Sequence, residues 1–185
     1  SSTKSLEIDP VNALSWKNKG IAFLGLDKYN EALLSYNEGI KIDSSDAEAW
    51  AGKGMALAEM GMYEEALNSY NTSLDLDKSK SDIWAKKSKV LNEMAMYDEA
   101  ITASTKAIDL NPFDATAWSI KGNAQSNLGK NEDALKSFEK TLEINPLDSS
   151  ALTPLGGGNY QATLPAQTGD SRYRFFVGAA EAVNG

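Results

Sequence analysis

The chain has 185 residues with neither Cys nor His, and its 18 basic and 26 acidic residues give a formal net charge of -8 at pH 7. The missing thiols and imidazoles exclude disulfides, Zn sites built on Cys or His, and catalysis of the Ser-His-Asp or Cys-His type. The acidic balance disfavours nucleic acid as a partner, and no apolar run is long enough to span a membrane.

The first twelve residues carry a pattern that returns near the other end of the chain. Leu6, Ile8 and Pro10 recur in the same order and spacing as Leu142, Ile144 and Pro146. Because the later copy falls at the end of a predicted helical unit, residues 1–12 are expected to be the end of a preceding unit. The chain is then a fragment of a longer array, or an end that has lost a helix.

From residue 13 onward the sequence repeats with a fixed period of 34 residues. The residues that carry the period are Trp16, Trp50, Trp84 and Trp118; Ala32, Ala66, Ala100 and Ala134; Lys19, Lys53, Lys87 and Lys121; and Tyr29, Tyr63 and Tyr97. A period of this length over four copies is typical of a solenoid of stacked helical units. The predicted units are 13–46, 47–80, 81–114 and 115–148.

Within one unit, the apolar spacing predicts two antiparallel helices. In the second unit, apolar residues recur at helical spacing over 47–60 and again over 64–76, and the two segments are joined by a short connection at Gly61. Small residues at the eighth and twentieth positions let the two helices approach closely. Large residues such as Trp50 and Tyr70 fill the space between neighbouring units.

The units resemble the tetratricopeptide repeat (TPR) family in their period and in their signature residues. In the second unit these residues are Trp50, Gly54, Tyr63, Ala66 and Tyr70, and the family's proline position is filled by Pro112 and Pro146 in the third and fourth units. The resemblance covers roughly residues 1–150 and implies an all-α fold, a right-handed α-solenoid of helix-turn-helix repeats. Ser88 and Ser104 depart from the usual Gly and aromatic residue, so looser packing is expected there.

Two charged features repeat with the units. The row formed by Lys19, Lys53, Lys87 and Lys121 would suit phosphate binding, but a solvated helix face is the favoured interpretation. Carboxylate pairs such as Glu64-Glu65 and Asp98-Glu99 would suit acid–base chemistry, but each pair falls where a second helix begins. Acidic residues in a first helical turn stabilise the helix dipole, which makes the structural interpretation the stronger one.

The composition changes after residue 148. Residues 149–158 are expected to be a broken repeat start, stopped at Pro154, and a linker at Gly156-Gly157-Gly158. The tail, 159–185, is β-prone, and a hairpin is predicted from Asn159–Leu164 and Arg172–Val177. Three alternatives stay open for it: docking on the last unit, disorder or pairing with a partner, and a joint to a truncated β domain, native or engineered.

The resemblance also implies where a partner would bind. In TPR proteins the first helix of each unit lines a concave groove, and the corresponding residues here include Lys17, Ile21, Leu24, Met55, Glu59, Lys89, Asn92, Asn123 and Asn127. Some family members hold the C-terminal carboxylate of chaperones with a clamp of Lys, Asn and Arg. The corresponding positions here carry Ala51, Met55, Lys86, Thr116 and Ile120, so that role is not expected.

The sequence therefore predicts a protein- or peptide-binding scaffold that is not an enzyme and uses no metal or cofactor. Two alternatives are a self-assembling module that forms homo-oligomers through its ends or tail, and a non-catalytic part of a larger enzyme. Neither the partner's identity nor the oligomeric state follows from the residues. The absence of Cys favours a cytoplasmic location.

Overall fold

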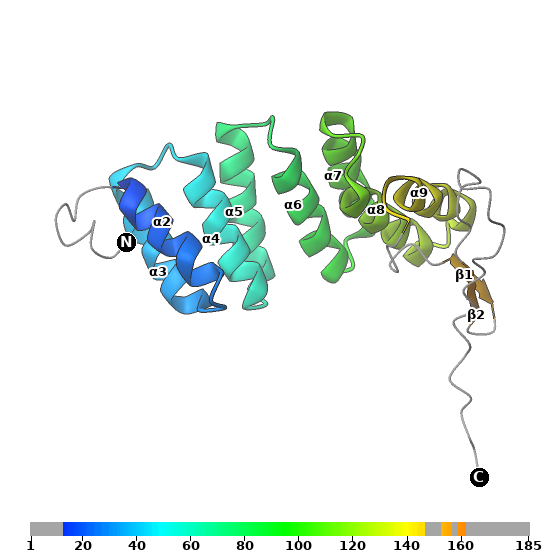
Figure 1. Ribbon diagram of the computed structural model, residues 1–185, viewed down its shortest axis with the longest axis horizontal. Helices are drawn as coiled ribbons and strands as arrows, with labels where there is room; N and C mark the ends of the chain where they lie inside the picture. Colours follow the sequence, from blue (N-terminus) through cyan, green and yellow to red (C-terminus); the bar gives the residue numbers. More distant parts are fainter. Residues whose placement is uncertain (1–12, 147–152, 157–158, 162–185) are drawn as a thin grey trace, which may run out of the picture.

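The computed structural model describes residues 13–146, 153–156 and 159–161. The described part contains eight helices, α2 to α9, arranged as four antiparallel pairs (Figure 1). Their bounds are α2 Ala13–Leu24, α3 Tyr29–Ile42, α4 Ala47–Glu59, α5 Tyr63–Leu76, α6 Ser81–Glu93, α7 Tyr97–Leu110, α8 Ala115–Asn127 and α9 Asn131–Ile144. The predicted α-solenoid is confirmed. We call the pairs the first to fourth repeats.

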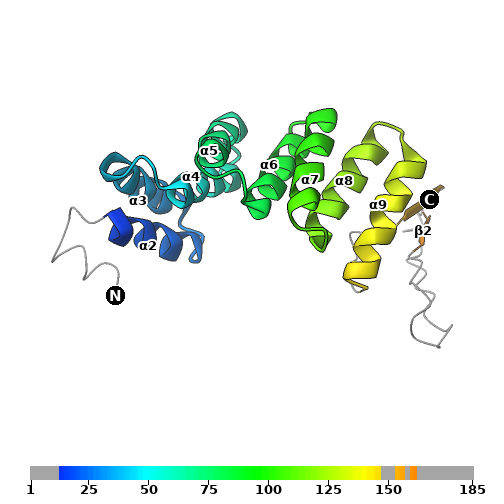
Figure 2. The same cartoon turned by 90° about the horizontal axis from the view of Figure 1, so that it is seen from above.

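The repeats stack side by side into an elongated array. Each helix pair is rotated relative to the one before it, so that α2 and α9 run in clearly different directions (Figure 2). The predicted small and large positions explain the close packing inside a repeat. Ala32, Ala66, Ala100 and Ala134 are 0–3% exposed. A Cβ atom built on Gly54 would meet the Tyr70 ring at 2.7 Å, so the ring lies directly on the glycine backbone.

The third repeat achieves the same closeness with different residues. Ser88 and Ser104 are both 0% exposed. The Ser88 Oγ donates to the Ala85 carbonyl at 2.8 Å, and the Ser104 Oγ donates to the Ala100 carbonyl at 2.8 Å. Helices α6 and α7 pack as closely as the helices of the other repeats. The expectation of looser packing was wrong, because two small side chains that bond their own helix backbones leave no void.

Repeated caps and turns define where the helices begin and end. The Asp46 carboxylate accepts hydrogen bonds from the Glu48 and Ala49 amides at the start of α4, which satisfies donors that the helix itself leaves free. The second helices have acidic residues in their first turn instead, including the predicted pairs. In the third repeat, Ala95 turns the chain with a φ of 57°, where the second repeat has Gly61.

The tryptophans of the second, third and fourth repeats each bond the loop that precedes their repeat. The Trp50, Trp84 and Trp118 Nε1 groups donate to the carbonyls of Ser44, Lys78 and Pro112 at 3.0, 3.2 and 3.0 Å. The accepting carbonyl comes from the loop between repeats in each case. These bonds add to burial of the ring and fix its orientation.

The hairpin at the end of the array differs from the predicted one. Strand β1, Thr153–Gly156, pairs antiparallel with β2, Asn159–Gln161, with Thr153 opposite Gln161. The segment predicted to be a broken repeat start and linker therefore supplies the first strand. Pro154 lies in that strand, and a two-stranded sheet consists only of edges, where proline is tolerated. The predicted second strand, Arg172–Val177, and residues 1–12 lie outside the described residues.

Candidate groove along α4

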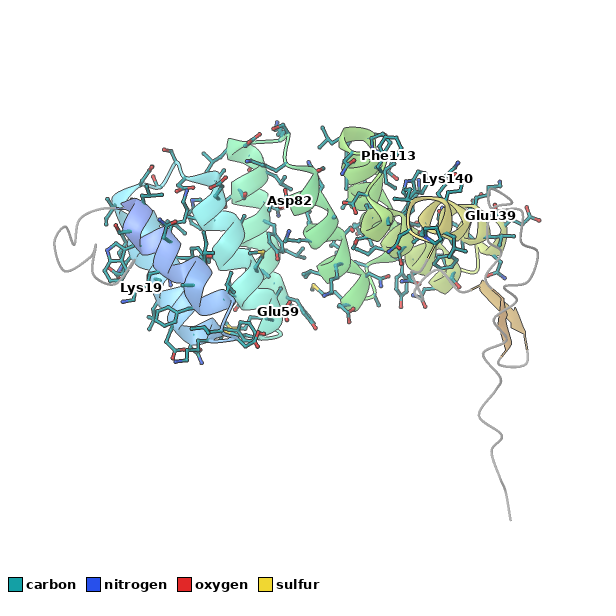
Figure 3. All side chains as sticks on the ribbon, viewed as in Figure 1. Lys19, Glu59, Asp82, Phe113, Glu139 and Lys140 are labelled. Carbon is teal, nitrogen blue, oxygen red and sulfur yellow. The ribbon has the colours of Figure 1, made fainter. Side chains whose placement is uncertain are left out.

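A groove runs along helix α4, between α2 on one side and α6 on the other. It consists of two connected hollows of about 260 and 870 Å³, which share Met55 and Lys86 as lining residues. We call them the smaller and the larger hollow, and together the α4 groove. Asp82 lies near the end where α4 and α6 begin, and Glu59 lies at the end where α4 stops (Figure 3).

The floor of the smaller hollow is formed by small residues. Ala47, Ala51 and Gly52 line it from α4, while Ile21 and Ile83 line it from the flanking helices α2 and α6. Small side chains on the central helix with larger ones on both neighbours produce a channel. A main chain in extended conformation fits such a channel better than a bulky compact ligand does.

The larger hollow is both aromatic and charged. Its apolar lining consists of Leu24, Tyr29, Met55, Ala58, Met60, Tyr63, Tyr70 and Val90. Its charged lining consists of Asp27, Glu59, Lys86, Lys89 and Glu93. The charged groups come from three different repeats, so the hollow exists only because the repeats stack.

The position of the larger hollow follows from one pair of residues. At the contact of α3 with α4, the Tyr36 ring lies against Gly52, where a Cβ atom would meet the ring at 2.2 Å. The equivalent residues one repeat later are Tyr70 and Lys86, which both line the larger hollow. A ring opposite a long side chain cannot pack as a ring on glycine does. Helices α5 and α6 accordingly pack less closely than α3 and α4 (Figure 1).

The tyrosines of the larger hollow are held in an acidic surrounding. The Tyr29 hydroxyl donates to the Asp27 carboxylate at 2.9 Å, and this bond, with burial and the Glu59 charge, raises the pKa of Tyr29. Burial raises the pKa of Tyr70, and Glu59 adds to the shift. Both phenols therefore stay protonated to a higher pH than an exposed tyrosine does, and the charge of Glu59 contributes to both shifts.

The hydroxyl of Tyr36 lies beneath the smaller hollow. Tyr36 is 1% exposed, and its Oη has no hydrogen-bond partner within the described part of the chain. Burial raises the pKa of Tyr36 to about 12. A buried hydroxyl without a partner is unusual, because its desolvation is not compensated.

The predicted groove residues separate into two groups. Ile21 and Met55 line the smaller hollow, and Leu24, Met55, Glu59 and Lys89 line the larger one. Asn92, Asn123 and Asn127 lie on α6 and α8 and do not line either hollow. The Oδ1 atom of Asn92 is buried without a hydrogen-bond partner.

Lys17 lies beside the groove but is already engaged. Its Nζ is 2.9 Å from the Asp46 carboxylate and 3.1 Å from that of Glu48, and its side chain is 14% exposed. Burial alone would lower the pKa of Lys17, but the bonds to the two carboxylates outweigh it, so the pKa is raised. Lys17 therefore joins α2 to α4 and is poorly placed to meet a ligand directly.

The repeated lysines form a feature that sequence reasoning missed. Lys19, Lys53, Lys87 and Lys121 each place Nζ over the tryptophan ring of their own repeat, 4.9–5.3 Å from its centroid. A cation at this distance from an indole face is attracted by the ring. The row is therefore not simply a solvated face. The spacing of Trp and Lys three residues apart on one helix was the available signal.

Two features are absent from the described part of the chain. It contains no group of three or more Asp or Glu placed to hold a metal ion. None of its helices combines the length and apolarity that a membrane crossing requires.

Models of the tetratricopeptide repeat match three consecutive segments of the chain. The matched residues are 47–80, 81–114 and 115–147, which together exceed half of the sequence. No curated protein sequence matches the chain.

Several solved structures are similar to the chain over most of the helical array. MamA is 26% identical with a TM-score of 0.74, covering 78% of this chain and 85% of its own. YrrB, described as a TPR protein with an unusual peptide-binding site, is 25% identical with a TM-score of 0.72, covering 82% and 78%. The first TPR of Spaghetti (RPAP3), bound to the HSP90 peptide SRMEEVD, is 28% identical with a TM-score of 0.57, covering 59% and 86%.

Proposed function

We propose that this chain, which belongs to the tetratricopeptide repeat family, binds an extended segment of a partner protein in the α4 groove. The observation that carries the proposal is the continuity of the two hollows, which share Met55 of α4 and Lys86 of α6 as lining residues. Clefts that bind peptides or small molecules combine an apolar lining with a few polar groups that fix orientation. The α4 groove has both.

The lining indicates how a segment would be held. Ile21, 54% exposed, presents an aliphatic side chain at the smaller hollow, and Met55 lies where the two hollows meet. Apolar side chains of the partner would bury surface against these residues. Methionine is unbranched and adapts to different shapes, so the groove need not be specific for one apolar residue.

The asparagines of α6 and α8 would extend this contact beyond the groove. An asparagine side chain both donates and accepts, and so can bond the N–H and C=O of an extended main chain. Asn123 and Asn127 follow on the next first helix, and the proposed binding face therefore runs from Ile21 to Asn127.

Two of the similar structures concern peptide binding, which supports the same kind of function here. YrrB is described by its peptide-binding site, and the RPAP3 repeat is bound to a chaperone peptide. This chain lacks the clamp residues expected for a chaperone C-terminus, so a different segment is proposed as its partner.

A pair of matched variants tests the proposal. Peptides selected from a random display library would be measured for binding to the chain by fluorescence polarisation. Ile21→Glu should weaken binding about tenfold or more, because it buries a charge against an apolar side chain. Leu34→Glu, on α3 and also exposed at 65%, should have little effect. Equal effects of the two variants, or a library without binders, would disprove binding in the groove.

The two other functions predicted from the sequence remain predictions. Stacking through the ends involves residues 1–12 and those beyond 146, which lie outside the helical part that the structure describes. Light scattering over a range of protein concentrations tests it, since a constant monomer mass excludes stacking. A role within a larger enzyme is decided by the sequence that flanks this one.

A further inference from the structure

The larger hollow carries more negative than positive charge. Asp27, Glu59 and Glu93 contribute three carboxylates, whereas Lys86 and Lys89 contribute two ammonium groups. Lys86 is already neutralised by Asp82, whose carboxylate lies 3.2 Å from its Nζ. None of the three carboxylates forms an ion pair with another described residue. A ligand therefore meets two more unpaired carboxylates than unpaired ammonium groups.

The same carboxylates stand beside apolar and aromatic walls. Met55, Ala58 and Leu24 offer aliphatic surface, and the rings of Tyr29, Tyr63 and Tyr70 line the hollow next to the acidic groups. The charge of Glu59 raises the pKa of both Tyr29 and Tyr70, and all three residues line the larger hollow. The hollow thus combines a surface for an apolar stem with an acidic, aromatic end.

We propose that the larger hollow receives an arginine side chain of the bound segment, with its stem on Met55 and its guanidinium between Glu59, Glu93 and the tyrosines. This inference rests on the proposed function, because it assumes that a segment lies in the α4 groove. Arginine fits better than lysine, since its planar group stacks on aromatic faces and pairs with carboxylates through two parallel hydrogen bonds.

Other side chains satisfy the hollow less well. A plain apolar side chain would leave the three carboxylates without a partner. An acidic side chain would be drawn to Lys89 but repelled by Asp27, Glu59 and Glu93. Among the residues that the structure describes, Lys89 is the one cation that lines the larger hollow without an ion-pair partner, and it weakens the attraction for arginine without reversing it.

Four matched peptides test the inference. They have the sequence acetyl-SLAXALS-amide, where X is arginine, citrulline, leucine or glutamate. Citrulline keeps the shape of arginine but lacks its charge. Binding would be followed by the NMR shifts of the Met55 and Met60 methyl groups, because both residues line the larger hollow. The arginine peptide should bind about fivefold more tightly than the citrulline peptide, a preference of the size that one ion pair and one cation–π contact provide.

The preference for arginine should depend on the carboxylates of Glu59 and Glu93. In the double variant Glu59→Gln/Glu93→Gln the preference for arginine over citrulline should disappear. The control variant Glu99→Gln/Glu132→Gln changes the net charge equally at two exposed residues that do not line the groove, and it should keep the preference. Loss of the preference in both variants would mean that only overall charge matters, which overturns the inference.

Failure of this inference differs from failure of the proposed function. If library peptides bind and depend on Ile21, but arginine and citrulline peptides bind alike or the glutamate peptide binds best, only the arginine assignment is overturned. The same holds if the four peptides leave the Met55 and Met60 shifts unchanged. If no library peptide binds, the proposed function fails and the arginine assignment fails with it.

Discussion

The contact of α3 with α4 and the contact of α5 with α6 occupy equivalent places in the array, yet the helices pack less closely at the second, which borders the larger hollow. The first is closed because the Tyr36 ring lies on Gly52. The second has Tyr70 and Lys86 in these places, and both border the larger hollow. A single exchange of glycine for lysine thus separates a sealed contact from an open one.

The contact of α7 with α8 shows that the pair, rather than either residue, sets the spacing. Its equivalent residues are Ser104 and Ile120, and both are buried. A small residue opposite a large one closes this contact as well, and α7 packs on α8 about as closely as α3 on α4. Protein interiors are packed to near-constant density. Two large side chains at the contact of α5 with α6 therefore force the helices apart.

The largest loss of stability is expected from removing the tryptophan of α6, the helix that packs less closely on α5. Trp84 packs against the clusters on both of its sides and bonds the Lys78 carbonyl, so it is the main residue that holds α6 to its neighbours. Trp84→Ala should lower the free energy of unfolding by about 3–5 kcal/mol. Because repeats contact only their neighbours, unfolding in urea should also separate into two transitions. Trp84→Phe, as the control, should lose less and keep one transition.

The fold was predictable from the sequence because its signal repeats. The spacing of Trp16, Trp50, Trp84 and Trp118 predicts stacked units, and the helices of the second repeat begin and end within a residue of the predicted bounds. Residues 159–161 form a strand as predicted, but they pair with Thr153–Gly156, a segment for which no strand was predicted. A lone short hairpin has few contacts that fix its register, which makes the pairing hard to predict.

The site was predictable only in part, because a hollow depends on pairs of residues from different repeats. Ile21, Leu24, Met55, Glu59 and Lys89 were identified through their positions on the first helices, and the structure brings them into the α4 groove. The role of the second helices was missed, since the contribution of Tyr70 emerges only when Lys86 is placed opposite it. Similarly, the ion pairs of Lys17 could not be predicted, because they depend on where Asp46 and Glu48 lie in the folded chain.

Substitution of the small residue in the closed contact sharpens the comparison. In Gly52→Ala the new methyl group would meet the Tyr36 ring at 2.2 Å, and such overpacking costs about 1–3 kcal/mol. The higher helix propensity of alanine offsets about 1 kcal/mol of this, so a net loss of up to about 2 kcal/mol is expected in urea unfolding. Lys86→Ala, at the equivalent place in the open contact, should change the stability by less than about 0.5 kcal/mol. Equal losses would show that the two contacts do not differ.

The smallest effect should have the opposite sign. Tyr36→Phe removes a buried hydroxyl whose Oη has no hydrogen-bond partner, so the variant should be more stable by about 1 kcal/mol. Tyr70→Phe should be closer to neutral, because the Tyr70 hydroxyl, unlike that of Tyr36, is not a fully buried group without a hydrogen-bond partner. Urea unfolding of both variants tests this difference.

The pH dependence of the free energy of unfolding is a second measurement of the effect of the Tyr36 hydroxyl. Burial raises the pKa of Tyr36 from 10.0 to about 12, so the neutral phenol is favoured in the folded chain. Its contribution to stability is complete below pH 10 and is lost as the pH rises towards 12. Tyr36→Phe should therefore show a smaller fall in stability than the parent chain across this range. If Tyr36→Phe is instead less stable than the parent chain, the hydroxyl must form a hydrogen bond. The close packing of α3 on α4 would then depend on that bond rather than on the contact of the Tyr36 ring with Gly52.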